Sequence, residues 1–437
     1  MTIFPQSVFH DSAEVDSQGQ LILGGCKASD LADEYGTPVY VLDEDTLRAR
    51  CRSFIDEFRK VHPDTNVSYA CKAYINPILA KLFMEEGMGF DVVSGGELAT
   101  TISAGIPMEE VYFHGNNKTP QELNEALENN IGWVVVDSFH EMQLLDQLAG
   151  EAGKTQDILI RVSPGVDPHT HVYTTTGVLD SKFGFSIQTG HAEEAIRMGL
   201  AAKNLNLRGL HFHLGSPIFE LEPYRVAVDL VLRFAAQFRE DGLEMQRFSP
   251  GGGFAISYTR GDEPPPVSDY AETITSTMKE TCEDLGMDLP SLVIEPGRAI
   301  IGPAGVALYR VGAIKDVPGV RKFVSVDGGM GDNIRPALYQ AEYEVVAANK
   351  ADQETAEKVT VAGKYCESGD LLATDVMLPI LESGDLLAIP AAGAYCPSMA
   401  STYNMNPRPP MVLVKDGKSR LIRRRESYQD LLNLDLV

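Results

Sequence analysis

Between residue 66 and about residue 294 the chain alternates short β-rich runs with amphipathic helical patterns. The β-rich runs lie near residues 66–70, 90–93, 111–113, 132–136, 157–162, 207–213, 246–249 and 291–294. Helical patterns follow most of them, at residues 77–86, 95–104, 120–130, 139–150, 191–203, 222–240 and 268–286. This repetition predicts a (β/α)8 TIM-type barrel. A doubly wound sheet has the same alternation and remains the competing layout.

After about residue 300 the helical period disappears. Short strand-like runs follow, separated by turn residues, at 306–309, 323–326, 343–346, 358–361 and 411–414. They predict a C-terminal all-β domain, a β-sandwich or β-barrel, over residues 301–437, after a barrel over residues 37–300. Residues 1–36 contain one strand candidate at 20–23 and are expected to join the β domain, because chain ends often lie together. The segment Gly261–Pro266 reads as a surface loop.

The charge and cysteine content exclude several classes of function. The net charge is -25, from 62 acidic and 37 basic residues, which argues against a nucleic-acid or anionic-membrane partner. The six cysteines are scattered without a C-x-x-C pair, as expected for reduced thiols in a cytoplasmic protein. No apolar run reaches the roughly 18 residues of a membrane span, and the first residues do not read as a signal peptide.

Chemically reactive side chains follow the predicted barrel strands, on the side where each strand ends. In chain order they are Lys72, Asp91, His114, Arg161, His211, His213, Gly251–Gly253 and Glu295–Arg298. The carboxyl ends of barrel strands meet at one face, where barrels bind substrates. The pattern therefore favours a single site at that face.

Lys72 follows the strand-like run Val67–Tyr69 directly. An amine at the end of a buried strand is expected to be buried, and burial lowers its pKa and makes it nucleophilic. Such lysines form Schiff bases with carbonyl compounds, including pyridoxal phosphate. A surface lysine at a strand end is the alternative.

Gly251, Gly252 and Gly253 leave backbone amides open to a phosphate, although a tight turn explains a glycine run equally well. Glu295 suits a pyridine nitrogen, which a carboxylate keeps protonated; an ion pair with Arg298 is the alternative.

His211 and His213 are two residues apart on a strand, so their side chains are expected on one face. A metal pair is conceivable, but no carboxylate or cysteine at ligand spacing accompanies them, and we expect no metal. An imidazole can instead lie over a flat cofactor ring. His169 and His171 are expected to be loop residues.

Taken together, these strings resemble the fold-type III pyridoxal-phosphate decarboxylases. The matching stretches run in order through nearly the whole chain: Tyr69–Ala73, Ser94–Leu98, Gly115–Lys118, Ser181–Gly184, His211–Ser216, Gly251–Phe254, Glu295–Arg298, Cys366–Asp370 and Gly393–Tyr395. Within the family, Cys366-Glu367-Ser368-Gly369-Asp370 resembles the diaminopimelate branch, since the ornithine branch usually has Asp after the cysteine. The resemblance implies the barrel and β-domain architecture shared with alanine racemase.

The resemblance also implies roles for individual residues. Lys72 would carry pyridoxal 5'-phosphate, His213 would stack on its ring, and Glu295 would pair with its nitrogen. The other expected cofactor contacts are Asp91, Ser216, Gly251, Gly252, Gly253, Gly297, Arg298 and Tyr395. The expected substrate contacts are Arg298, Arg335, Tyr339, Glu367 and Tyr395.

Cys366 is the expected proton donor after carbon dioxide leaves. The resemblance implies an obligate homodimer in which the loop with Cys366 and Glu367 reaches the partner's site. The expected reaction is decarboxylation of meso-2,6-diaminopimelate to L-lysine, the last step of lysine biosynthesis. The alternatives are a related decarboxylase of the carboxynorspermidine, D-lysine or ornithine type, an amino acid racemase, and a non-catalytic cofactor carrier.

Overall fold

A computed structural model describes residues 4–167 and 181–436. The chain divides into two compact units. The barrel unit holds Cys51–Ala255 and Pro264–Gly297. The sheet unit holds the chain up to Arg50, the excursion Ile256–Glu263, and the chain from Arg298 onward. His169 and His171 lie outside the described residues.

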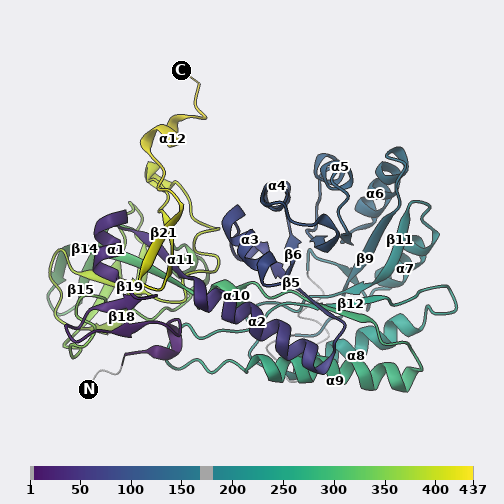
Figure 1. Cartoon of the computed structure of the whole chain (residues 1–437), viewed down its shortest axis with the longest axis horizontal. Helices are drawn as coiled ribbons and strands as arrows, with labels where there is room; N and C mark the ends of the chain where they lie inside the picture. The colour runs from purple at the N-terminus through teal and green to yellow at the C-terminus, as the bar shows by residue number, and fades with distance from the viewer. Residues whose placement is uncertain (1–3, 168–180, 437) are drawn as a thin grey trace. The chain divides into compact units, whose positions relative to one another are not determined.

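The barrel unit contains a closed, all-parallel sheet of eight strands (Figure 1). Its strands are β5 (Thr65–Ala70), β6 (Gly89–Val92), β7 (Val111–Phe113), β8 (Trp133–Val136), β9 (Gln156–Ser163), β11 (Leu205–His211), β12 (Arg247–Gly251) and β13 (Ser291–Ile294). The short β10 (Phe185–Ser186) pairs with β9 outside this circle. β8 pairs with β9 and β13 with β5, so the sheet closes on itself. The TIM-type barrel is confirmed, and a doubly wound sheet is excluded.

Helices alternate with these strands, as the sequence predicted. They are α2 (Glu44–Val61), which leads into β5, followed by α3 (Pro77–Glu85), α4 (Gly95–Ala104), α5 (Pro120–Glu128), α6 (Phe139–Glu151), α7 (His191–Ala201), α8 (Glu222–Ala236) and α9 (Val267–Leu285). Local sequence sets where several of them begin. Thr119 and Glu122 form a reciprocal capping box at the start of α5, and Ser94 and Ser138 cap α4 and α6.

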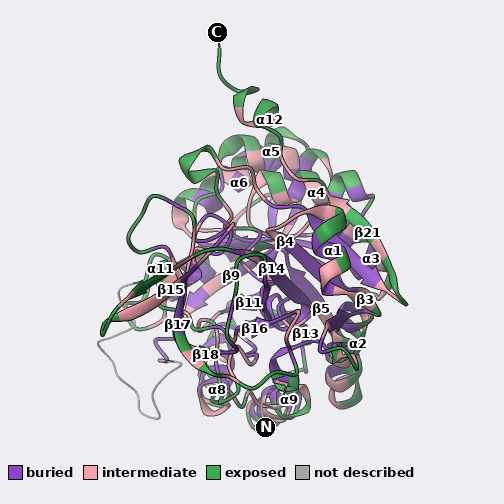
Figure 2. Cartoon of the chain, turned by 90° about the vertical axis from the view of Figure 1, so that its left-hand side faces the viewer, coloured by how far each residue is buried: buried purple, intermediate pink, exposed green. Residues whose placement is uncertain are grey.

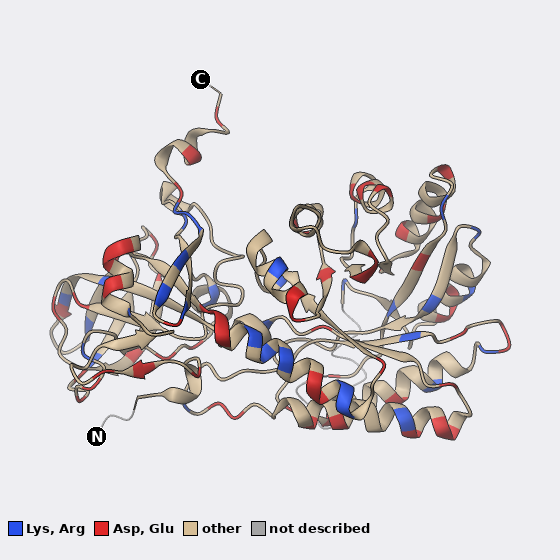
Figure 3. Cartoon of the chain, in the orientation of Figure 1, with Lys and Arg blue, Asp and Glu red and all other residues tan. Residues whose placement is uncertain are grey.

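The barrel strands are the buried layer of this unit (Figure 2). Acidic and basic residues occur in turn along α2, one of the helices of this unit (Figure 3). This pattern follows from amphipathic helices that bury one face and leave the other to water.

The sheet unit is built on β14 (Gly305–Val317), a long strand that pairs with three others. The strand order is β18 (Leu371–Leu378), β17 (Glu357–Ala362), β15 (Arg321–Val326), β14, β4 (Val39–Asp43), β20 (Met411–Lys415) and β21 (Lys418–Arg423). β19 (Leu386–Ile389) pairs with β14 and with β16 (Val346–Ala347). A separate small sheet contains β1 (Glu14–Val15), β2 (Leu21–Leu23) and β3 (Cys26–Lys27).

Short helices complete this unit and the loops of the barrel unit. They are α1 (Ala28–Tyr35), α10 (Arg298–Ile301), α11 (Arg335–Tyr339), α12 (Tyr428–Leu432), η1 (Gln6–Val8), η2 (Cys71–Ala73), η3 (Met108–Glu110) and η4 (Tyr403–Met405). In the described part of the chain, none of the helices has the length and apolar character that crossing a lipid bilayer would require.

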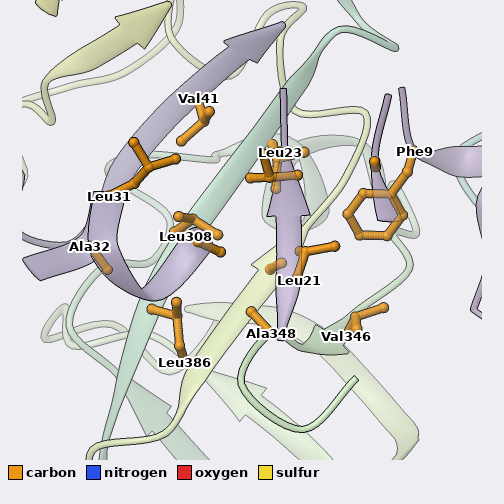
Figure 4. Packing of buried hydrophobic residues seen from close by; sticks show 14 of the residues in the cluster. Phe9, Leu21, Leu23, Leu31, Ala32, Val41, Leu308, Val346, Ala348 and Leu386 are labelled. Carbon is orange, nitrogen blue, oxygen red and sulfur yellow. The ribbon is translucent and has the colours of Figure 1, made fainter. Parts of the chain in front are cut away.

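The core of the sheet unit joins both ends of the chain (Figure 4). Leu21 and Leu23 of β2 pack with Leu31 of α1, Leu308 of β14 and Leu386 of β19, all buried. The N-terminal strand predicted at residues 20–23 therefore exists and buries its side chains against late parts of the chain.

Two segments lie elsewhere than their sequence pattern indicated. β4 falls inside the residues predicted as barrel, yet it pairs with β14 and β20 of the sheet unit. Most of the strand expected at 343–346 is irregular, because Glu344 donates its backbone N–H to Tyr258 of the excursion at 3.1 Å. The Gly261–Pro266 loop is thus partly an arm of the sheet unit.

Candidate active site

The carboxyl ends of the barrel strands bring the predicted reactive groups together. Asp91 lies on β6, His114 directly after β7, His211 at the end of β11, and Glu295 directly after β13. His114 lies between the two carboxyl groups: its Nε2 is 3.6 Å from Glu295 Oε1 and 3.7 Å from Asp91 Oδ1. These groups, which the sequence placed at one face of the barrel, form a single cluster there.

Lys72 corrects one expectation: its side chain is exposed, not buried. It lies in η2, the single turn after β5, and has left the packed strand. Burial raises the pKa of Asp91 and of Glu97, the Lys72 charge acts against that rise, and the same charge opposes protonation of His213. The amine is therefore near enough to act on these groups, and it is exposed to solvent.

Glu295 is a buried carboxylate held by two donors. Ser249 Oγ donates to Oε1 at 2.7 Å, and His211 Nε2 lies 3.2 Å from Oε2. Burial by itself raises the pKa of this carboxyl, but the His211 and His114 imidazoles and the bonds from His211 and Ser249 hold its pKa well below the usual value. Glu295 is therefore an anion, suited to accept a hydrogen bond from a ligand.

The pKa of Asp91 is shifted in the opposite direction to that of Glu295. Burial, and then the charge of Glu295, raises its pKa well above the usual value, while Lys72 lowers it. His114 is equally enclosed, and burial lowers its pKa well below that of an exposed imidazole. One buried anion thus disfavours a second, and His114 lies between the two carboxyl groups.

His213 lies beyond the end of β11 and is half-buried. The backbone N–H of Gly252 donates to its Nδ1 at 3.3 Å, so Nδ1 is an acceptor. Burial, and then the charges of Lys72 and Arg161, lowers the pKa of His213 well below its usual value. The imidazole is neutral and tied to the glycine run, which fixes the plane of its ring.

The Gly251–Gly253 run is packed so closely that side chains have no room. A Cβ on Gly252 would lie 2.1 Å from the carbonyl oxygen of Glu295, and one on Gly251 would lie 2.8 Å from His213 Nδ1. Gly251 and Gly253 also have φ values of 76° and 110°, which favour glycine. The run is therefore a tight turn, in which the backbone N–H of Gly251 donates to Ser249 Oγ at 3.1 Å and that of Gly252 to His213 Nδ1.

His114, His211 and Glu295 offer ligand atoms within 4.8 Å of one another and could hold a metal ion. The hydrogen bonds from His211 and Ser249 already engage both oxygens of the Glu295 carboxylate. The conceivable metal pair of His211 and His213 is not the group that the structure brings together, and β11 ends at His211, before His213. The expectation of no metal stays a prediction.

Supporting pairs surround this cluster. Lys118 is buried and donates to Glu141 Oε1 at 2.6 Å and to two backbone carbonyls. Arg161 lies 3.4 Å from Asp137 and 4.4 Å from the centre of the Phe183 ring. A cavity of about 220 Å³ lies beside Arg161, Phe183 and His213. Spacing along the sequence gave no signal for these pairs, since each joins segments that are more than 20 residues apart.

In the sheet unit, two buried arginines share one tyrosine. Tyr258 accepts hydrogen bonds from Arg298 Nη1 and, at 2.8 Å, from Arg335 Nη1. Tyr343 accepts from the same nitrogen of Arg335 at 2.9 Å. The ring of Tyr395 lies under both guanidinium groups, 4.8 Å from the Cζ of Arg298 and 5.7 Å from that of Arg335. Arg298, Arg335 and Tyr395 were singled out from the sequence, and they lie together.

The remaining predicted residues of the sheet unit are exposed. Tyr339 ends α11 with 60% of its surface accessible. Cys366 and Glu367 are exposed on a turn that buried Asp370 anchors, because Asp370 accepts from the backbone N–H groups of Met330 and Tyr365. The turn is therefore held in place by Asp370, while the Cys366 thiol and the Glu367 carboxylate are exposed.

Of the residues predicted for a phosphate, Ser216 is exposed, and Gly297 is buried against Ala70 and Ala73. An added Cβ on Gly297 would lie 3.0 Å from the carbonyl oxygen of Ala70. A side chain at this position would thus collide with the end of β5, directly before Lys72.

Comparisons with known proteins agree with this geometry. The family model described as "Pyridoxal-dependent decarboxylase, pyridoxal binding domain" matches residues 44–302. A diaminopimelate decarboxylase of Bacillus subtilis is 46% identical over 98% of both chains, and one of Synechocystis is 42% identical over 99% of this chain and 93% of its own. This chain belongs to the pyridoxal-dependent decarboxylases, in the diaminopimelate decarboxylase family. The solved diaminopimelate decarboxylase of M. jannaschii in complex with L-lysine has a TM-score of 0.93 at 36% identity, with 98% of each chain covered.

A pyridoxal-dependent decarboxylase uses pyridoxal phosphate, and the residues present fit that cofactor. The glycine run keeps side chains away where a Cβ would collide, an anionic Glu295 suits a protonated pyridine, and an accessible Lys72 suits an aldehyde.

Proposed function

We propose that this pyridoxal-dependent decarboxylase removes carbon dioxide from meso-2,6-diaminopimelate and forms L-lysine. The observation that carries the proposal is the arginine pair of the sheet unit. Arg335 is buried, and within the described residues its hydrogen-bond partners are tyrosine hydroxyls and no carboxylate. A buried guanidinium without a counter-charge is costly. A substrate carboxylate remote from the reacting carbon would supply that charge, and a simple diamine precursor such as ornithine has none.

We propose the following cofactor contacts. Lys72 would hold the aldehyde end, Glu295 and His213 would hold the ring, and Asp91, whose pKa the Lys72 charge acts to lower, is a further contact. The phosphate contacts are Ser216, Gly251, Gly252, Gly253, Gly297, Arg298 and Tyr395. When bound, pyridoxal phosphate draws electrons away from the carbon that loses carbon dioxide.

The chain's own residues do the rest. Glu295, held anionic by Ser249 and His211, would accept a hydrogen bond from a protonated pyridine nitrogen and so favour the positive charge on that nitrogen. An arginine at this position, as amino acid racemases usually have, would not do so. We assign Arg298, Arg335, Tyr339, Glu367 and Tyr395 to the substrate: two positive groups and one negative group suit the carboxylate and ammonium of its distal end.

Cys366 is the proposed proton donor to the carbon that has lost carbon dioxide, and we propose that its loop serves the partner's site in a homodimer. The loop is exposed, and Asn404 holds the Cys366 backbone N–H at 2.8 Å. Exposed apolar side chains lie on the same unit, among them Tyr403 and Met405 of η4. Aromatic residues and methionine are enriched at the cores of subunit interfaces, which suits this proposal.

The shared site has a direct test. Lys72→Ala chains and Cys366→Ala chains are each expected to be inactive or slow. When they are mixed under conditions of proven subunit exchange, hybrid dimers should recover part of the activity, because one of their two sites keeps both residues. No recovery would refute a shared site.

The substrate assignment is tested with purified protein, pyridoxal phosphate and one amino acid at a time. We expect lysine from meso-diaminopimelate, and much lower kcat/KM with ornithine, D-lysine and carboxynorspermidine. Racemised diaminopimelate without carbon dioxide would indicate a racemase, and cofactor binding without turnover would indicate a carrier. We also propose a cytoplasmic location, since the six cysteines are free thiols.

A further inference from the structure

We propose that the Tyr258 hydroxyl is an additional substrate-binding group, which donates a hydrogen bond to the distal carboxylate of the substrate. The inference rests on the proposed function and deepens it, because it adds a specificity-determining residue to the arginine pair.

The hydroxyl oxygen of Tyr258 accepts hydrogen bonds from two donors, which leaves the hydroxyl hydrogen without an acceptor among the described residues. Arg298 and Arg335 carry only donors, and each points an Nη1 at the Tyr258 oxygen. That oxygen therefore accepts twice, and its own hydrogen is left for an acceptor. Among the residues that the structure describes, no side-chain or backbone oxygen takes this hydrogen. A carboxylate that bound both guanidinium groups would lie beside the same hydroxyl.

Tyr343 shows what a purely supporting tyrosine does in the same cluster. Its hydroxyl also accepts from Arg335 Nη1, at 2.9 Å, but it lies 3.4 Å from Cys396 Sγ and shares a hydrogen there. Tyr343 and Cys396 are both buried. Tyr343 thus has a protein partner on each side and serves to position Arg335, whereas Tyr258 is half-buried.

The chain fixes Tyr258 in place before any ligand arrives. Asp262 Oδ2 accepts the backbone N–H groups of Tyr258 and Thr259, both at 2.8 Å, which closes the tip of the excursion Ile256–Glu263. The Tyr258 carbonyl accepts the N–H of Glu344, and Arg260 pairs with the Glu344 carboxylate at 2.7 Å. A donor held this firmly loses little entropy when it binds.

The test compares Tyr258→Phe with Tyr343→Phe, because both remove one hydroxyl that accepts from Arg335. We measure inhibition by L-lysine, which keeps the distal carboxylate, and by cadaverine, which has no carboxylate. Removing a hydrogen bond to a charged group should weaken inhibition by L-lysine by about tenfold or more in Tyr258→Phe. Inhibition by cadaverine should stay within about twofold of wild type.

Tyr343→Phe, which removes only a positioning contact, is expected to weaken L-lysine binding clearly less. Tyr35→Phe, which loses a hydroxyl contact to Ser419 elsewhere in the sheet unit, is the control for a general effect of losing a tyrosine hydroxyl. Circular dichroism verifies that each variant is folded.

Each outcome decides between the hypotheses. Equal losses for L-lysine in Tyr258→Phe and Tyr343→Phe, or equal losses for L-lysine and cadaverine in Tyr258→Phe, would overturn the proposal. If wild type makes no lysine from meso-diaminopimelate, the proposed function fails instead. A Tyr258→Phe variant that does not fold is replaced by Asp262→Asn, which loosens the tip of the loop and should weaken L-lysine selectively; an unselective loss there refutes the proposal.

Discussion

Replacing Glu97 by glutamine should change how the stability of the protein depends on pH. Glu97 lies in the first turn of α4, where its carboxylate accepts the backbone N–H of Val93 at 2.8 Å. Burial raises its pKa from the ordinary 4.5 to about 7, against the effects of that bond and of the Lys72 charge. The fold therefore favours the protonated form of this side chain.

The sign and size of the change in unfolding free energy follow from the linkage between protonation and folding. A pKa that folding raises contributes stability that is fully present below about pH 4.5 and is lost as the pH rises through about 7. A rise of about 2.5 pKa units, at 1.36 kcal/mol per unit, corresponds to about 3 kcal/mol. Glutamine has no proton to lose. Relative to wild type, Glu97→Gln should therefore gain about 3 kcal/mol of unfolding free energy between about pH 5 and about pH 8.

The assay is urea unfolding of cofactor-free protein across this pH range, so that Lys72 keeps its charge. Glu122→Gln is a matched control of opposite sign. Burial acts to raise the pKa of Glu122, but bonds from the backbone N–H groups of Thr119 and Gly95 hold it below its usual value. That variant should lose stability at neutral pH and regain it, relative to wild type, as the pH falls. A pH-independent difference for Glu97→Gln would refute the reasoning.

Three further predictions concern the site itself. Gly252→Ala should lose cofactor affinity and stability, because its Cβ would lie 2.1 Å from the carbonyl of Glu295, whereas Gly261→Ala, with open space around the new Cβ, should not; a cofactor titration compares them. Borohydride reduction of cofactor-loaded protein should fix a pyridoxyl group on the peptide containing Lys72, and mass spectrometry of Lys72→Ala should find none there. Cys366→Ala should lower kcat and leave cofactor binding intact; a normal kcat would remove the thiol from the mechanism.

The barrel was predictable because its signals are local. Strand and helix periods, and caps such as Thr119 with Glu122, are visible within a few residues, and the carboxyl ends of parallel strands necessarily share one face. Grouping Lys72, Asp91, His211 and Glu295 needed no knowledge of distances. The family resemblance added the roles of these residues, which the strand pattern alone left open between a Schiff-base site and ordinary surface groups.

What the sequence did not reveal depends on pairings between distant segments. Whether β4 pairs with β13 or β14 cannot be read from its own five buried residues, since a fully buried strand suits either sheet. The exposure of Lys72 depends on a single turn after β5. His114 could have been suspected from its place after a strand, but its position between two carboxyl groups requires the closed barrel.

The excursion Ile256–Glu263 shows why a surface loop can be decisive for function. Its flank is acidic and rich in proline, as solvated loops often are. The sequence was therefore interpreted as a surface loop, and Tyr258 was not singled out. A loop needs no apolar period to be ordered if its backbone groups find partners, and here Asp262 and Glu344 provide them. Because the bond to Glu344 joins segments more than 80 residues apart, the loop can fix a hydroxyl between two arginines that no local pattern connects. Selectivity for a second carboxylate would then depend on a segment that is inserted into the barrel sequence but folds with the sheet unit.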